Sequence, residues 1–205
     1  LIRLTSKVLR IRAMPEENKN LSEMMQLNEH YKAIFDKAGL SAQPGKRIAI
    51  LTCMDCRLNP YEFAGLKDGE AHIIRNAGGR ATDDAIRSLV VSHKVLGTKD
   101  WFIIGHTECG MSKITDEVLG QLLEQDLETA SLEKGLWINP KRDSTKNCKP
   151  GSVLGKTINW GTFTDLHQTI LDDIDTIRQH PLVSSHVNIH GLIFDVHTGG
   201  LKIIK

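Results

Sequence analysis

A short apolar stretch that runs directly into a cluster of reactive side chains constrains this sequence most strongly. Residues 48–52 read Ile-Ala-Ile-Leu-Thr, and Cys53, Asp55, Cys56 and Arg57 follow within five positions. An unbroken run of apolar and β-branched residues is typical of a strand that is buried on both faces. Open α/β sheets carry their chemistry at the carboxyl ends of such strands. We therefore expect a parallel sheet with a reactive site at the end of this strand.

A second apolar stretch ends in a similar cluster. Residues 100–105 read Asp-Trp-Phe-Ile-Ile-Gly, and His106 and Cys109 come directly after them. Two strand ends of this kind can bring Cys53, His106 and Cys109 to one point. Two thiolates and one imidazole favour zinc over magnesium or calcium. Three protein ligands leave the fourth tetrahedral position for water or substrate, as in catalytic zinc sites.

Alternating strand and helix patterns predict an α/β fold with a single domain. We expect a central, mostly parallel sheet of about four strands plus an antiparallel edge strand, flanked by helices. The strands are predicted at residues 47–52, 71–75, 100–105 and 187–196, with the edge strand at 201–204 after a turn at 198–200. Helices are predicted at residues 15–39, 82–97, 112–125 and 164–179, with a short helical turn from Asn59 to Ala64.

Side-chain types define two of these helices more closely. Thr82 followed by Asp83 and Asp84 is typical of a helix start, because a hydroxyl and two carboxylates satisfy the free N–H groups and the helix dipole. In the first helix, apolar side chains recur on one face, which predicts a covering helix that buries this face. These side chains are Met24, Leu27, Tyr31, Ile34 and Phe35.

Two regions have no clear assignment to the sheet. Residues 1–14 carry Arg and Lys side chains without an acid. Three interpretations are open for them: a remnant of a basic organelle presequence, an upstream extension before Met14, or a helix that packs on a neighbouring subunit. In each case we expect residues 15–205 to form the zinc domain. Within residues 120–156 the periodicity fades, and we expect a long surface excursion that shapes the pocket mouth, contacts a subunit or is simply solvated.

Composition narrows the range of partners and compartments. The chain has 205 residues with 26 basic and 25 acidic side chains, so its formal net charge is +1. This balance gives no reason to expect nucleic acid or an anionic membrane as a partner. No apolar run is long enough to cross a bilayer. Four cysteines in a chain of this size do not form a disulfide framework, which favours a cytoplasmic location, or a mitochondrial one if a presequence is present.

Three blocks of residues, each at a predicted strand end, resemble one protein family. The blocks are Cys53-x-Asp55-x-Arg57, then residues 75–79 (Arg-Asn-Ala-Gly-Gly), then His106-x-x-Cys109. In this order and spacing the sequence resembles the β-class carbonic anhydrases. The resemblance covers residues 46–109 and resumes at 187–196, whereas residues 120–156 lie outside it.

The resemblance implies a fold, a cofactor and an activity. It implies that Cys53, His106 and Cys109 bind one Zn²⁺ per subunit and that the enzyme hydrates CO₂ to bicarbonate. Zinc lowers the pKa of a water ligand to about 7, so hydroxide is available at neutral pH. Asp55 would orient this hydroxide, and Arg57 would hold the Asp55 carboxylate ionised. The family resemblance also implies a homodimer or a higher oligomer.

Several alternatives remain open at this stage. Carbonyl sulfide or carbon disulfide hydrolysis, which releases hydrogen sulfide, would use the same zinc ligands. A non-catalytic zinc-stabilised module would require Asp55 as a permanent fourth ligand. Cys53 and Cys56 also match a Cys-x-x-Cys redox motif. Gly78 and Gly79 let the backbone approach the substrate pocket or form an ordinary turn.

The remaining histidines carry no spacing that indicates a ligand set. Solvated or structural roles are expected for them, and their spacing does not single out one as a proton relay. They are His30, His72, His93, His167, His180, His186, His190 and His197.

Overall fold

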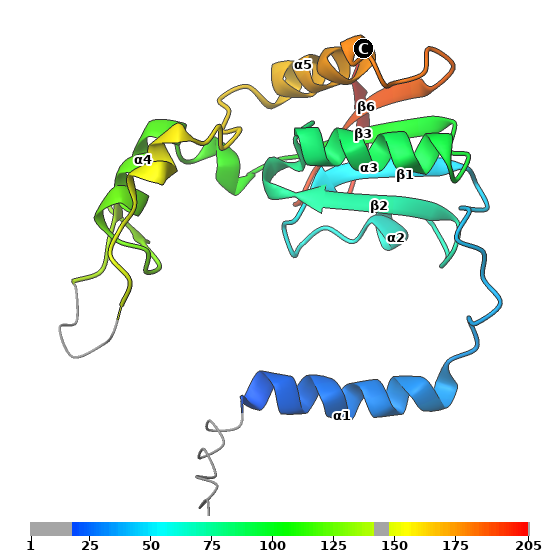
Figure 1. The fold of residues 1–205 in the computed structure, drawn as a ribbon, viewed down its shortest axis with the longest axis horizontal. Coiled ribbons are helices and arrows are strands. Elements are labelled where there is room, and N and C mark those ends of the chain that lie inside the picture. The colour runs from blue at the N-terminus through cyan, green and yellow to red at the C-terminus, as the bar shows by residue number, and fades with distance from the viewer. Residues whose placement is uncertain (1–17, 142–147, 205) are drawn as a thin grey trace, which may run out of the picture. The chain divides into compact units, whose positions relative to one another are not determined.

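The computed structural model describes residues 18–141 and 148–204 (Figure 1). The chain divides into two compact units, Leu1–Leu40 and Ser41–Lys205. The first unit holds helix α1 (Lys19–Ile34), and the described strands all lie in the second. The predicted boundary between residues 14 and 15 lies outside the described residues.

A five-stranded sheet forms the centre of the second unit. Its strand order is β2-β1-β3-β6-β7, in which the first four strands are parallel and β7 is an antiparallel edge strand. The predicted α/β fold is therefore confirmed. The strand bounds are Ile48–Cys53 for β1, Ala71–Asn76 for β2, Asp100–His106 for β3, Asn188–Phe194 for β6 and Leu201–Ile204 for β7.

Two amphipathic helices cover one face of the sheet. Helix α3 (Asp83–Lys94) and helix α5 (Leu166–Gln179) both pack on this face, as Figure 1 shows. Thr82 caps α3 by accepting a hydrogen bond from the Ala85 N–H, as the sequence predicts. The apolar side chains of the two helices meet those of β1 and β3 in one buried cluster. It includes Leu51, Trp101, Ile103, Ile86, Leu89, Ile170, Ile174 and Ile177.

The opposite face carries a smaller apolar cluster that reaches the strand ends. The short helix α2 (Pro60–Phe63) begins after Asn59, whose side chain accepts the Tyr61 N–H. The Phe63 and Phe194 rings lie 4.7 Å apart, so α2 packs near the end of β6. Cys53 and Cys109 belong to the same cluster. The predicted site therefore lies in an apolar environment.

Helix α1 differs from its prediction in length and in burial. It ends at Ile34 instead of continuing to Gly39, and the Asn18 side chain caps its N-terminus. The predicted start at Pro15 lies outside the described residues. No residue of α1 is buried, although the sequence predicts a buried apolar face. The apolar stripe is present and is exposed within the unit that α1 belongs to.

Residues 110–157 hold more regular structure than the sequence predicts. A 3₁₀ turn, η2 (Gly110–Ser112), precedes helix α4 (Asp116–Gln125), so the helix is shorter than the expected 112–125. The expected excursion contains a hairpin of β4 (Ser131–Glu133) and β5 (Leu136–Ile138). A second 3₁₀ turn, η3 (Val153–Thr157), packs against α4. The described residues of this segment therefore pack around α4 rather than forming a solvated loop, while residues 142–147 lie outside the described ranges.

None of the helices described here combines the length and the apolar character that a membrane span requires.

Candidate metal centre

The ends of β1 and β3 bring three potential metal ligands together. Cys53 is the last residue of β1, His106 is the last residue of β3, and Cys109 lies in the loop that follows. All three are buried, with exposed fractions of 4%, 1% and 2%. One ligand atom from each lies within 4.8 Å of the other two. The two strands are parallel neighbours, which is why residues far apart in sequence meet here.

The hydrogen bonds of His106 fix which ring nitrogen is free. Its Nδ1 lies 2.9 Å from the Thr107 carbonyl oxygen, which can only accept, so Nδ1 carries the proton. Nε2 is then an unprotonated acceptor, and it is buried without a hydrogen-bond partner. A buried polar atom without a partner costs free energy unless a ligand satisfies it. An Nε2 lone pair beside two buried sulfur atoms is suited to bind a zinc ion. Histidines that bind zinc through Nε2 commonly donate the Nδ1–H group to a carbonyl oxygen, as His106 does here.

The two sulfur atoms lie within hydrogen-bond distance of each other, and this contact shifts the pKa values of the two thiols in opposite directions. The Cys53 and Cys109 Sγ atoms lie 3.9 Å apart, close to the edge of a zinc tetrahedron with bonds of about 2.3 Å. The hydrogen bond from Cys109 lowers the pKa of Cys53 against the opposing effect of burial, and the N–H groups of Asp55 and Gly78 act in the same direction as Cys109. The bond to Cys53 in turn raises the pKa of Cys109. The contact therefore favours the thiolate form at Cys53 over that at Cys109.

Asp55 and Arg57 form a two-point ion pair beside this centre. Arg57 Nε lies 3.0 Å from Asp55 Oδ1 and Nη2 lies 2.8 Å from Oδ2. These bonds hold the pKa of the Asp55 carboxyl well below its usual range. Asp55 Oδ2 lies 3.9 Å from His106 Nε2. An ionised carboxylate of fixed orientation therefore faces the free ring nitrogen.

The two glycines that follow β2 allow close backbone packing. Gly78 and Gly79 are buried and have φ angles of 80° and 68°, which favour glycine. A Cβ atom on Gly79 would lie 2.8 Å from the Cys53 backbone nitrogen. Arg75 also supports this loop, because its guanidinium donates to the carbonyl oxygens of Cys53 and Asp55. The role of Arg75 was not predicted, although it stands in the same block as the glycines.

Glu108 occupies an unusual backbone position between two of the candidate ligands. Its φ angle is 54°, a left-handed conformation that non-glycine residues adopt rarely. The Glu108 carbonyl accepts a hydrogen bond from Arg57 at 3.2 Å, and its carboxylate lies 3.1 Å from His197 Nε2. The His197 contact lowers the pKa of Glu108. The backbone turns sharply at Glu108, between His106 and Cys109.

Cys56 lies outside this cluster. It is exposed, and the nearest cysteine partner of Cys53 is Cys109 rather than Cys56. The residues that the Cys-x-x-Cys pattern pairs are therefore not the ones that the fold brings together. This arrangement gives the redox interpretation no support.

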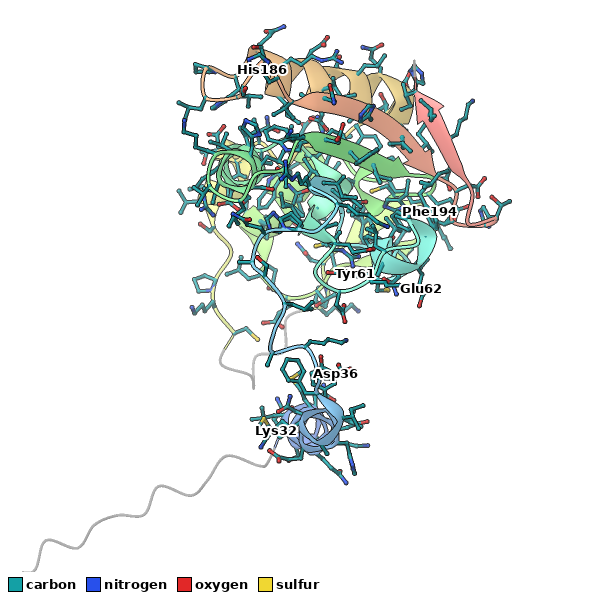
Figure 2. All side chains as sticks on the ribbon, turned by 90° about the vertical axis from the view of Figure 1, so that its right-hand side faces the viewer. Lys32, Asp36, Tyr61, Glu62, His186 and Phe194 are labelled. Carbon is teal, nitrogen blue, oxygen red and sulfur yellow. The ribbon has the colours of Figure 1, made fainter. Side chains whose placement is uncertain are left out.

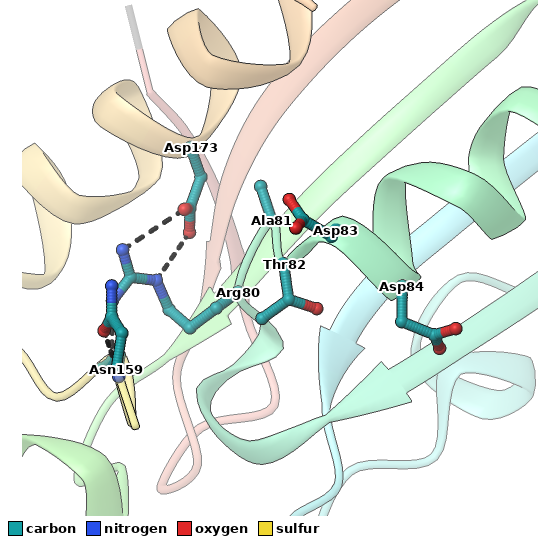
Figure 3. A pocket seen from close by; sticks show the side chains of 8 residues that line it. Arg80, Ala81, Thr82, Asp83, Asp84, Asn159 and Asp173 are labelled. Atoms are coloured by element: carbon teal, nitrogen blue, oxygen red, sulfur yellow. Dashed lines mark hydrogen bonds and ion pairs between the residues drawn. The ribbon is translucent and has the colours of Figure 1, made fainter. Parts of the chain in front are cut away.

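A separate pocket of about 440 Å³ lies beside α5. Figure 3 shows the Arg80 side chain pointing toward Asp173, which it binds through two hydrogen bonds of 2.8 and 3.2 Å. The third donor group of Arg80 binds the Gly161 carbonyl. The guanidinium is thus engaged by protein groups and joins the 159–163 segment to α5. Its role is structural, and sequence spacing gave no signal for it.

Comparisons with known proteins agree with this geometry. The carbonic anhydrase family model matches residues 48–201. Beta-carbonic anhydrase 1 of Mycobacterium tuberculosis is 34% identical over 175 residues, which is 85% of this chain and 91% of the relative. A carbon disulfide hydrolase of Acidithiobacillus thiooxidans is 35% identical over 160 residues, covering 77% of this chain and 76% of the relative.

A solved structure resembles the whole fold. The carbonic anhydrase from Streptococcus mutans superposes with a TM-score of 0.75 at 32% sequence identity. The match covers 93% of this chain and 100% of that one. This structural match agrees with the sequence relatives and with the clustering of Cys53, His106 and Cys109. The chain belongs to the β-carbonic anhydrase family.

Proposed function

We propose that this protein hydrates CO₂ to bicarbonate with one zinc ion per subunit. The observation that carries the proposal is the unpaired, buried Nε2 of His106 beside the sulfur atoms of Cys53 and Cys109. This donor set matches the thiolate and imidazole preference of zinc. Three protein ligands also leave a position for a substrate molecule.

Cys53, His106 and Cys109 would hold the metal. Zinc at this position supplies Lewis acidity that lowers the pKa of a water molecule to about 7. The Thr107 carbonyl keeps the His106 ring in the orientation and tautomer that binding requires. The lowered pKa of Cys53 makes its thiolate available without a strong base.

Asp55 would orient the attacking water molecule. A carboxylate that remains ionised can accept a hydrogen bond from this water and direct an oxygen lone pair toward the carbon of CO₂. Arg57 keeps Asp55 in this state and geometry through its two-point contact. Since Arg57 binds both carboxylate oxygens, the geometry favours an open catalytic site over a module closed by Asp55.

Gly78 and Gly79 would form the backbone wall of the substrate pocket. Their buried positions and their approach to Cys53 support this role. The substrate is small, linear and uncharged, so an apolar site suffices to bind it. The apolar side chains packed around Cys53 and Cys109 would line such a site, and they include Leu58, Ile104 and Phe194.

The leading alternative is hydrolysis of carbonyl sulfide or carbon disulfide with the same metal ligands. The specific observation in its favour is the 35% identity to a carbon disulfide hydrolase. The two substrate classes differ in size rather than in the chemistry they require. The width and lining of the pocket therefore decide between them.

A paired assay on one zinc-loaded sample separates these functions. CO₂ hydration and sulfide release from carbonyl sulfide are measured together with the metal content. We expect CO₂ hydration to dominate, and Asp55→Asn to reduce it by about 10- to 100-fold while the zinc content is kept. Fast sulfide release with negligible CO₂ hydration would reverse the assignment.

Self-association and location are parts of the same proposal. The apolar stripe of α1, which is exposed within its own unit, favours a homodimer or a higher oligomer. Cys53, Cys56 and Cys109 are free thiols, which suits a reducing compartment such as the cytoplasm.

A further inference from the structure

The loops after β3 and β6 lie side by side at the edge of the sheet that carries the metal centre. His106 and Phe194 are paired in the parallel register of these strands. The Thr107 N–H donates to the Phe194 carbonyl at 3.0 Å, and the Thr107 hydroxyl accepts the Val196 N–H at 3.0 Å. These bonds place His197 next to the loop that holds His106 and Cys109.

A short series of contacts connects His197 to the catalytic pair. Asp55 binds Arg57, whose Nη1 lies 3.7 Å from Glu108 Oε2. Glu108 Oε1 lies 3.1 Å from His197 Nε2. The His197 side chain is 67% exposed, so solvent and buffer reach it freely. His197 is therefore a titratable group on the rim of the site, at the boundary with bulk solvent.

We propose that His197 accepts the proton that CO₂ hydration releases and passes it to buffer, with Glu108 as its positioning residue. The inference rests on the proposed function. The Glu108 carboxylate can only accept, so neutral His197 donates Nε2–H to it and leaves the Nδ1 lone pair free.

With His197 as the acceptor, every proton that CO₂ hydration releases is accounted for. Water and CO₂ give bicarbonate and a proton, which binds Nδ1 and forms an imidazolium. A buffer base then removes this proton and restores neutral His197. Arg57 does not carry the proton, because a guanidinium does not deprotonate in proteins, so solvent carries it across the rim.

Four charged groups of the described residues act on the imidazole directly or through Glu108. Glu108 contacts the ring, while Arg57 and Lys113 act on Glu108. The Asp195 carboxylate accepts the backbone N–H of His197. If the role of His197 were purely structural, its contact with Glu108 would only hold the loops after β3 and β6 together. The experiment must therefore separate proton transfer from this link.

Two substitutions make this separation. His197→Ala removes both the base and the link, whereas His197→Gln keeps a donor for Glu108 but has no group that accepts a proton at neutral pH. In stopped-flow CO₂ hydration at low buffer concentration, we expect both variants to lose about tenfold or more in kcat. Their kcat/KM should stay unchanged, and added imidazole should restore kcat.

His186→Ala is the matched control. His186 is an exposed histidine before β6, whereas Phe194 ends this strand, as Figure 2 shows. This variant should keep wild-type kcat at every buffer concentration. If His197→Gln keeps kcat, or if imidazole rescues neither variant, His197 is only a structural link and the proposal fails. An inactive wild-type protein would overturn both proposals, whereas an active one with unaffected variants overturns this one alone.

Discussion

The placement of one proton on the His106 ring decides what the metal centre can do. Because the Thr107 carbonyl takes the Nδ1 proton, Nε2 is left as a lone pair next to Cys53 and Cys109. The opposite tautomer would direct an N–H at the position where a cation has to bind. The chemistry of the site is thus set by a backbone carbonyl that carries no sequence signal of its own.

At the same scale, Gly79 is expected to tolerate no side chain. In Gly79→Ala the new Cβ would meet backbone atoms of Thr52 and Cys53 at 2.8 Å, in a backbone of φ 68°. We expect the free energy of unfolding to fall by about 2 kcal/mol or more, through strain and overpacking together. Urea unfolding measures this loss.

Gly199→Ala is the control for this prediction. Gly199 has a similar φ of 72°, but a Cβ atom there would meet nothing within 4 Å. This variant should lose only the backbone cost of about 1–2 kcal/mol. Equal losses at the two positions would show that close contact with β1 is not what requires Gly79.

The clustering of Cys53, His106 and Cys109 was predictable from sequence because parallel strand ends converge. Cys53 and His106 each follow an apolar run, and the topology of a parallel sheet brings such positions to one edge. The contact between Glu108 and His197 was not predictable, since it joins residues 89 positions apart on loops whose paths depend on tertiary packing.

At the scale of elements, the segment of residues 159–163 is held by hydrogen bonds to Arg80 and to helix α4. Arg80 binds its Gly161 carbonyl, and Asp116 at the start of α4 accepts hydrogen bonds from Trp160 and Thr162. The Phe163 N–H then bonds to the Met111 carbonyl, and Phe163 packs on the cluster that contains Cys53. Helix α4 is thereby coupled to the surroundings of the metal centre.

The Asp116 contacts make a pH-dependent contribution to stability. Burial alone would raise the pKa of Asp116, but hydrogen bonds from Thr162, Trp160 and Gly161 lower it overall. A lowered folded-state pKa stabilises the protein above the ordinary value of 3.8, and this contribution is lost as the pH falls through the folded-state pKa.

Asp116→Asn should therefore lower the free energy of unfolding by about 1–3 kcal/mol at pH 7. The difference from wild type should narrow below pH 3.8, the ordinary value for this group. Urea unfolding across this range measures both effects. Glu117→Gln is an exposed neighbour in the same helix turn and should show little change. A difference between Asp116→Asn and wild type that is independent of pH would contradict the ionic origin.

Sequence periodicity predicted long elements better than short ones. Helices α3 and α5 were recognised from their apolar stripes, and Thr82 marked a helix start. The β4–β5 hairpin was missed because three-residue strands are too short to show an alternating pattern. Its turn is formed by Lys134 and Gly135, both with positive φ, and this Lys-Gly pair was the available signal.

At the scale of the whole molecule, α1 has no buried residue within its own unit. Ile34 is 77% exposed, and Met24, Leu27 and Tyr31 on the same stripe are also exposed. Apolar periodicity predicts this stripe, whereas the surface that covers it does not follow from the sequence of one chain. A second copy of the chain is the partner that our proposal assigns to it.

Charges on this stripe should therefore disrupt the assembly. We expect the double variant Leu27→Glu/Tyr31→Glu to shift sedimentation from at least twice the 22.8 kDa chain mass toward the single chain. Gln26→Glu/Ala33→Glu adds the same charge on the opposite side of α1 and should leave the assembly intact. If wild type sediments as a single chain at micromolar concentration, the dimer proposal is wrong.

The most direct test of the account as a whole is the zinc content of four purified proteins, measured together with CO₂ hydration. Wild type and Cys56→Ala should each hold one zinc ion per chain and remain active, because Cys56 lies outside the cluster. Cys53→Ala and His106→Ala should lose both metal and activity. If either of these two variants keeps full zinc content and full activity, the metal centre described here is not the catalytic site.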